Sequence, residues 1–141
     1  MKSDNPVAIK PIVSSDHKFL YLLLANRDSI ANISHKKMPT YKEHIKFVTS
    51  KPYVKWYIIY YKRKKSGSIY LTKQNEIGIS IKKQMQNMGI GGAALELLIN
   101  KNPRDRYLAN VNPKNTKSIN FFKKNRFTLI QQTYELINTD A

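Results

Sequence analysis

The stretch with the clearest chemical pattern is residues 76–98, EIGISIKKQMQNMGIGGAALELL. A strand over Glu76–Ile81 is expected to lead through a polar connection into the glycine-rich turn Gln86–Gly91, which opens an apolar helix. Gly89 and Gly91 permit positive φ and close approach of a ligand, so several backbone N–H groups can point at one place. Such a turn at a helix N-terminus suits a pyrophosphate, and the missing Lys-Ser/Thr ending of a P-loop argues against an NTPase.

A second pattern follows at residues 115–127, NTKSINFFKKNRF. Together the two segments resemble the GCN5-related N-acetyltransferases. Gln86-x-x-Gly89-x-Gly91 is similar to the acetyl-CoA pyrophosphate loop of that family, and residues 115–127 are similar to its N-x-x-A/S-I-x-x-Y-x-K-x-G-F segment. The resemblance covers residues 76–127 and implies an α/β (α+β) fold, a central mixed and mostly antiparallel sheet flanked by helices. We therefore expect one N-acetyltransferase domain over residues 1–141, with acetyl-CoA as the acyl donor.

The resemblance also implies which residues contact the cofactor. The backbone of Ile79, Ser80 and Ile81 would bind the pantetheine arm in the manner of an added strand. Phe122 would lie beside the thioester sulfur. The other implied contacts are Gln86, Asn87, Met88, Gly89, Ile90, Gly91 and Gly92 at the pyrophosphate, with Asn115 and Ser118 on the later segment.

Three positions depart from the family's pattern. Phe122 stands where the family often has a Tyr that can protonate the leaving thiolate, and a phenyl ring has no proton to give. Asn110 stands where members that act on protein N-termini often carry a Glu base. Arg126 replaces the usual Gly, which we expect to affect only the turn.

Acetyl transfer to an amine needs a neutral nucleophile, a route for its proton and stabilisation of the thioester oxyanion. Glu76 and His44 are the candidate bases, and Tyr134 is a candidate acid, with Tyr107 and Tyr70 as other possible donors. Glu76 could instead balance the charge of a nearby lysine, and His44 could be a partly buried structural residue. A mechanism that uses positioning and water alone also remains open.

A looser resemblance, in residues 26–47, 56–59 and 76–79, indicates a class of acceptor. These segments are similar to the branch of the family that acetylates nucleotide-linked 4-amino sugars in the pseudaminic acid pathway. That similarity implies Arg27, Met38 and His44 in the acceptor pocket, where basic residues would suit a diphosphate. We therefore expect a small anionic acceptor with a primary amine.

The charge of the chain agrees with this expectation. Lys and Arg total 25 against 9 Asp and Glu, a formal net charge of +16. Such a charge favours anionic partners and makes an acidic cleft for an aminoglycoside or polyamine difficult to build. Compositional drift is the favoured explanation of the charge, since Lys, Asn and Ile rise together in AT-rich coding sequences.

Two other functions remain open. One is a different acceptor within the family: a protein N-terminus, a ribosomal protein or a small amine. The other is a non-catalytic module that senses acyl-CoA or binds nucleic acid, which predicts binding that weakens steeply with salt. The basic turn Lys62–Lys65 would be its contact, although a solvated hairpin tip has the same composition.

Several classes are excluded by the residues present. The chain has no Cys, so disulfides and thiolate chemistry are excluded, and its three His are too scattered to predict a metal site. No apolar run has membrane-spanning length, and the N-terminus lacks the apolar stretch of a signal peptide. We expect a cytoplasmic protein that is a monomer or homodimer.

The expected elements follow from periodicity and capping signals. Thr40 and Glu43 have the spacing of a capping box, and the helix that follows is expected to bury Tyr41, Ile45 and Val48 and to end before Pro52. A charged turn is expected over residues 62–67. The expected strands are Val7–Val13, Lys55–Tyr61, Ser68–Leu71, Glu76–Ile81, Tyr107–Val111, Phe127–Ile130 and Thr133–Leu136. The other expected helices run from Ser14 or Ser15 to Ala25, from Ile90 to before Pro103, and from Asn115 to Asn125.

Overall fold

The computed structural model of the chain describes residues 5–27 and 37–138. Four strands form one antiparallel sheet in the order β1-β2-β3-β4. The strands are β1 (Val7–Pro11), β2 (Lys55–Tyr61), β3 (Lys64–Leu71) and β4 (Ile77–Ile81). The helices are α1 (His17–Ala25), α2 (Tyr41–Thr49), α3 (Ile90–Lys101) and α4 (Thr116–Lys124), with the 3-10 turns η1 (Ser14–Asp16) and η3 (Lys83–Met85).

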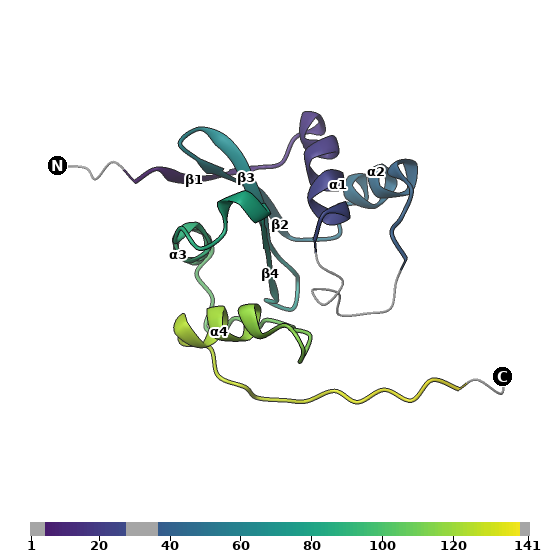
Figure 1. The fold of residues 1–141 in the computed structure, drawn as a ribbon, viewed down its shortest axis with the longest axis vertical. Coiled ribbons are helices and arrows are strands. Elements are labelled where there is room, and N and C mark those ends of the chain that lie inside the picture. Colours follow the sequence, from purple (N-terminus) through teal and green to yellow (C-terminus); the bar gives the residue numbers. More distant parts are fainter. Residues whose placement is uncertain (1–4, 28–36, 139–141) are drawn as a thin grey trace.

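Both faces of the sheet are covered by helices (Figure 1). Alternate strand residues such as Ile59 and Ile69 pack with Ala94 and Leu98 of α3 in the larger core cluster. The opposite face carries Ile58, which packs with Leu20 of α1 and Val48 of α2. Central strands buried on both faces explain the near-continuous apolar run KWYIIYY of β2.

The helix α2 begins as its capping box predicts. Glu43 N–H donates to Thr40 Oγ1 at 3.1 Å, and Thr40 N–H donates to Glu43 Oε1 at 2.8 Å. Its buried side chains are His44 and Val48, whereas Tyr41 is exposed. The buried Val48 and the half-buried Ile45 therefore confirm most of the expected face, whereas Tyr41 lies outside it because α2 packs against α1 through His44.

Asp16 joins the start of α1 to the sheet. Its buried carboxylate accepts from Val13 N–H at 2.9 Å and pairs with Lys65 Nζ of β3 at 2.6 Å. The helix therefore begins at His17, with Ser14 and Ser15 in a 3-10 turn rather than at the cap.

The connection between β2 and β3 is shorter than expected. Only Lys62 and Arg63 lie between the strands, with φ of 49° and 69°. Two positive φ values are typical of a two-residue hairpin turn, which usually carries Asn-Gly. Because Lys-Arg lacks that signature, the sequence did not indicate how short the turn is. Consequently β3 starts at Lys64, not at Ser68.

Helix α4 ends in a hydrogen-bonded cap that sets the direction of the remaining chain. Phe127 N–H donates to Phe122 O at 2.9 Å, Arg126 N–H donates to Lys123 O at 3.0 Å, and Arg126 has φ of 72°. This is the Schellman arrangement, with Arg in the left-handed position that usually holds Gly. The family's Gly at this position therefore has a conformational reason, and Arg126 adopts the same conformation.

The structure corrects the last three of the expected strands. Residues Phe127–Ile130 and Thr133–Leu136 are extended but pair with no strand of the described chain. Tyr107–Val111 is reduced to a single parallel bridge between Leu108 and Glu76. The residue pattern specifies an extended backbone, whereas strand pairing requires a neighbouring edge. None of the described helices is long and apolar enough to cross a bilayer.

Candidate functional site

The outer edge of β4 opens immediately after the bridge at Glu76. Ile77 N–H donates to Leu108 O at 2.7 Å, and Leu108 N–H donates to Asn75 O at 2.8 Å. Beyond Ile77 the two segments no longer pair. Because backbone direction alternates along an antiparallel strand, the N–H and C=O of Ile79 face the same outer side as those of Ile77. An extended ligand could pair with Ile79 there as a further strand does.

The three strand residues expected at the pantetheine arm differ in what they offer. Ile79 presents its backbone to the open edge, whereas Ser80 lies opposite Ser68 in the ladder with β3 and turns its backbone inward. Ile81 C=O faces outward but accepts from Gln86 Nε2 at 3.1 Å. The side chain of Gln86 thus fastens the loop to the end of β4, a role that its position in the motif did not predict.

The loop after β4 turns its backbone toward the start of α3. Asn87 and Gly89 have φ of 64° and 76°, and Gly89 is the N-cap of α3 without a side-chain hydrogen bond. No hydrogen bond within the described chain uses the N–H groups of Ile90, Gly91 and Gly92. Uncapped N–H groups at the positive end of a twelve-residue helix form an anion site.

The two motif glycines are required for different reasons. A Cβ on Gly89 would meet nothing within 4 Å, so its backbone conformation is the constraint. A Cβ on Gly91 would lie 3.0 Å from the ring of Phe121 and 3.7 Å from Ile79 Cδ1. Gly91 therefore lets α3 approach both α4 and the open edge of β4.

On α4 the expected cofactor residues have structural contacts. Asn115 Oδ1 accepts from Ser118 N–H at 3.2 Å and so caps the helix. Phe122 is buried and meets Phe121 and Phe127 edge-to-face, with ring centroids 5.1 Å and 5.0 Å away. The ring next to the glycine loop is that of Phe121.

The structure joins two residues that the sequence singled out separately. Asn110 Nδ2 donates to Glu76 Oε2 at 2.9 Å, across 34 positions of sequence. Thr72 Oγ1 donates to Glu76 Oε1 at 3.2 Å. The carboxylate thus stands at the start of the open edge, oriented by two neutral groups, and no ion pair joins it to the described Lys73.

Tyr70 covers the β4 residue next to Ile79. It lies opposite Gly78 in the ladder, and a Cβ on Gly78 would overlap its phenol. Tyr70 stacks on Tyr53, with ring centroids 3.7 Å apart at 3°. Burial and the neighbouring Tyr70 raise the pKa of Tyr53, whereas the charge of Arg27 acts to lower it. Arg27 therefore lies near this aromatic pair.

His44 is buried rather than poised at an open site. It is 5% exposed and meets the ring of Tyr21 edge-to-face at 5.3 Å. Burial, and secondarily the charge of His17, lowers the pKa of His44. Its Nε2 has no hydrogen-bond partner among the described residues. Met38, the other expected acceptor contact, is exposed just before α2.

Tyr134 is not brought to this site. It belongs to the extended chain after α4, is 87% exposed, and its hydroxyl donates to Gln132 Oε1 at 2.9 Å. Figure 1 shows that chain running away from the sheet. As an acid for this chain's own site, Tyr134 would require the segment to move.

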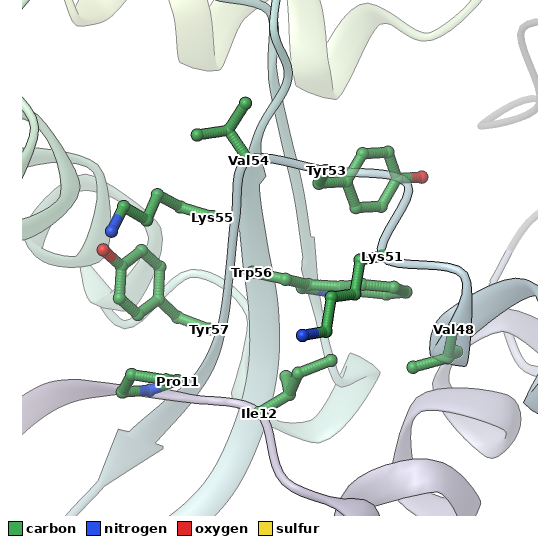
Figure 2. A pocket seen from close by; sticks show the side chains of 9 residues that line it. All are labelled: Pro11, Ile12, Val48, Lys51, Tyr53, Val54, Lys55, Trp56 and Tyr57. Carbon is green, nitrogen blue, oxygen red and sulfur yellow. The ribbon is translucent and has the colours of Figure 1, made fainter.

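A pocket of about 330 Å³ lies at the N-terminal end of β2, beside Trp56 (Figure 2). Figure 2 shows Tyr57 and Lys55 on one side of the strand and Trp56 and Lys51 on the other. β3 separates β2 from β4, so the pocket is apart from the open edge. A second pocket, of about 410 Å³, extends from Gly92 along α3 to Lys124 and Arg126.

No family profile and no curated protein matches this sequence. Among solved structures, a domain from Methanocaldococcus jannaschii DSM 2661 is 20% identical, with a TM-score of 0.77 and 94% of each chain covered. The acetyl transferase from Salmonella typhimurium that modifies the N-terminal serine of 50S ribosomal subunit protein L7/L12 is 19% identical, with a TM-score of 0.74, over 96% of this chain and 89% of that one.

RimL, the ribosomal L7/L12 alpha-N-protein acetyltransferase, is similar in its complex with coenzyme A. It is 18% identical, with a TM-score of 0.72, over 91% of this chain and 83% of that one. The chain therefore has the α/β fold found in acetyltransferases, as the two motifs implied. At these identities the likeness establishes the fold and leaves the activity to be argued from the site.

Proposed function

We propose that this protein is an acetyl-CoA-dependent N-acetyltransferase. The observation that carries the proposal is the open edge of β4 at Ile79, which leads directly to the uncapped N-terminus of α3 at Gly89. An extended pantetheine arm needs a strand edge, and a pyrophosphate needs converging N–H groups. The chain supplies both within residues 79–92. Lys124 and Arg126, beside Gly92 in the second pocket, suit the remaining phosphate of the cofactor.

The reaction follows from the groups at the edge. The acceptor nitrogen attacks the thioester carbonyl, and the Ile79 N–H stabilises the oxyanion that forms there. Glu76 accepts the proton of the amine directly or through water, because it stands at the start of the same strand. The C–S bond then breaks, and the thiolate of coenzyme A takes up a proton.

The source of that last proton cannot be Phe122. Tyr70 is the phenol that the fold brings to Gly78, next to Ile79, and it is our candidate donor. Tyr134 would serve only if the C-terminal chain moved, and water is the remaining donor. His44 is too buried to receive a proton from a soluble acceptor, so Glu76 takes the role of base in this proposal.

For the acceptor we propose a small anionic molecule with a primary amine, such as a nucleotide-linked amino sugar. Arg27 near the Tyr53–Tyr70 pair and the net charge of +16 support an anionic acceptor. Met38, which is exposed just before α2, is a further candidate contact for the acceptor. A protein N-terminus is the second candidate, favoured by the likeness to the two L7/L12 acetyltransferases.

The cofactor site is tested by calorimetric titration of acetyl-CoA into the protein and two variants of one residue. Gly89→Asp places a negative charge at the anion site, while Gly89→Asn has nearly the same shape without the charge and tolerates positive φ. A Cβ at position 89 would meet nothing within 4 Å, so both variants differ from Gly mainly in the strain of the positive φ, which they share. We expect Asp to weaken binding at least about tenfold relative to Asn. Absence of acetyl-CoA binding by the wild type would refute the proposal.

The acceptor is tested by thiol release from acetyl-CoA with amino-sugar nucleotides, peptides with free N-termini and small amines in parallel. Turnover with the first group alone supports an anionic sugar acceptor. Acetyl-CoA binding without any turnover, together with nucleic-acid affinity that falls steeply with salt, would favour the non-catalytic module that Phe122 and Asn110 leave open.

A further inference from the structure

The turn between β2 and β3 is made of residues that its backbone conformation disfavours. Lys62 and Arg63 have φ of 49° and 69°, in the left-handed region where a two-residue hairpin turn prefers Asn and Gly. Compositional drift toward Lys raises Asn as well, and Asn is plentiful in this chain. Drift therefore accounts for the total charge but also supplies the residue that this turn prefers. A Lys-Arg pair held against that preference indicates a use for the two charges.

The turn is held firmly by the residues around it. Lys62 N–H donates to Pro6 O at 2.9 Å, which ties the turn to the chain just before β1. The buried Ser66 donates through its Oγ to Lys64 O, also at 2.9 Å. The ammonium of Lys62 lies 5.3 Å from the ring centroid of Tyr61. Because backbone and side chain are already ordered, binding a ligand here costs little further conformational entropy.

Basic side chains from two other segments gather around this turn. Lys82 N–H donates to Ser66 O at 2.8 Å, so the residues that follow β4 lie beside the start of β3. Lys10 of β1 has its Nζ 5.2 Å from the ring centroid of Tyr60, near the end of β2. Figure 1 shows the turn between β2 and β3 projecting from one end of the sheet. We call this surface the basic end of the sheet, and its members are Lys10, Lys62, Arg63, Lys64 and Lys82.

The positive charge of the basic end is not balanced by carboxylates. None of its side chains forms an ion pair within the described chain, whereas the adjacent Lys65 pairs with the buried Asp16. The large apolar side chains that the described surface exposes, such as Phe47 and Leu129, belong to other segments. A lipid surface takes up apolar side chains together with positive charge, whereas a phosphate backbone needs the positive charge alone.

We propose that the basic end of the sheet binds the phosphate backbone of a nucleic acid. Uncompensated ammonium and guanidinium groups on a rigid turn are what phosphate contacts require. Such contacts carry no sequence information, so the binding should not depend on base sequence. The cofactor edge is the outer side of β4, whereas the turn joins β2 to β3, so the two ligands should bind independently. The proposal does not depend on the acetyltransferase activity.

The first experiment measures fluorescence anisotropy of labelled duplex RNA, duplex DNA and single-stranded RNA of mixed sequence, with the full chain, over a series of salt concentrations. The double variant Lys62→Asn/Arg63→Gly removes two charges and installs the preferred turn residues. The double variant Lys62→Gln/Arg63→Gln removes the same charges without the preferred residues. We expect both to bind about tenfold more weakly, with the slope of log K against log salt reduced by about 2.

The control variant has the same loss of charge elsewhere. Lys42→Gln/Lys46→Gln changes two exposed lysines of α2, which Figure 1 shows away from the basic end. We expect its affinity for nucleic acid to stay within about twofold of the wild type, since only long-range charge is lost. An equal loss of affinity in this control would overturn the proposal, because bulk charge alone would then explain the binding.

Thermal unfolding of the same variants tests why Lys and Arg occupy the turn. Lys62→Asn/Arg63→Gly should raise the temperature midpoint by about 2–6 °C, since Asn and Gly adopt positive φ at lower cost. Lys62→Gln/Arg63→Gln should leave the midpoint close to that of the wild type. Higher stability together with weaker binding would show that the two residues are kept for their charge.

The remaining measurements separate nucleic acid from other anions. Absence of nucleic-acid binding by the wild type would overturn the proposal, and so would binding to phosphatidylserine vesicles alone. Calorimetric affinity for acetyl-CoA should be unchanged in both variants of the turn. A parallel loss of acetyl-CoA affinity would overturn the proposal by assigning the basic end to the cofactor. A preference among the three probes would show which kind of nucleic acid is bound.

Discussion

The two sides of the candidate site are built from different parts of the polypeptide. On the cofactor side, the groups available to a ligand are backbone N–H and C=O groups, at Ile79 on β4 and at Gly89–Gly92 on α3. On the side of α1 and α2, the available groups are side chains, with Tyr53 stacked on Tyr70 and Arg27 nearby, whereas His44 is buried against Tyr21 of α1.

This difference explains what low-identity comparisons can teach. Backbone groups are presented by the fold, and the fold persists in structures only 18–20% identical. Side chains at equivalent positions change freely at that distance. The shared fold therefore includes the backbone that presents these N–H and C=O groups, whereas both the cofactor and the acceptor must be argued from this chain's own site.

The largest effect should come from removing one backbone donor on the cofactor side. Ile79→Pro deletes the outward N–H but leaves the ladder with β3, because that N–H faces the open edge. We expect kcat to fall about 100- to 1,000-fold. Ile79→Ala is the control, since it loses the side chain and keeps the N–H. Equal rates in the two variants would show that the amide has no role in stabilising the oxyanion.

Glu76→Gln tests the residue that joins the two sides. It keeps the shape of the carboxylate but cannot take a proton, so we expect kcat to fall about 100-fold with little change in acetyl-CoA affinity. Asn110→Ala leaves the carboxylate in place, and a smaller fall is expected there because Glu76 loses only its orienting partner.

On the other side, a single methyl group should act through side chains alone. Gly78→Ala forces Tyr70 off β4, which disturbs its stack with Tyr53 and costs about 2 kcal/mol of unfolding free energy. We expect a raised KM for the acceptor, a lower kcat because Tyr70 is also the candidate proton donor, and unchanged calorimetric affinity for acetyl-CoA. A matched loss of both affinities would mean that the two sides are not separate.

The smallest effect is a dependence of stability on pH through His44. Burial holds the pKa of His44 in the folded protein below its ordinary value of 6.5. The neutral form is favoured by folding, so stability is full above about pH 6.5 and is lost as the pH falls from there toward the lowered value. The temperature midpoint of thermal unfolding should therefore decrease as the pH is lowered from about 7.5 to about 5.5. His44→Gln should flatten this trend, and an unchanged slope would contradict it.

Local signals in the sequence predicted local structure well. Thr40 and Glu43 form the expected capping box, and Gly89 takes the positive φ that the glycine pattern required. The turn at Lys62–Arg63 was predicted, but its length was not, because neither residue type is typical of the backbone conformation of a two-residue turn.

Contacts between distant residues could not be predicted from one sequence. The bond from Asn110 to Glu76 and the cover of Tyr70 over Gly78 depend on strand register, which no local pattern specifies. The two expected C-terminal strands failed for the same reason, because residues 127–138 have strand-forming composition but belong to no sheet of the described chain.

The contact between Tyr70 and Gly78 has a consequence for how this sequence can diverge. A larger residue at position 78 becomes tolerable only after the ring at position 70 has shrunk or moved, and Tyr53 then loses the surface on which it stacks. The three positions should therefore change together among descendants of this gene, while Ile79, which offers its backbone but packs against the core, should exchange only with other apolar residues that keep the N–H. The residues found at positions 53, 70 and 78 in natural variants should then differ according to the acceptor that each variant uses.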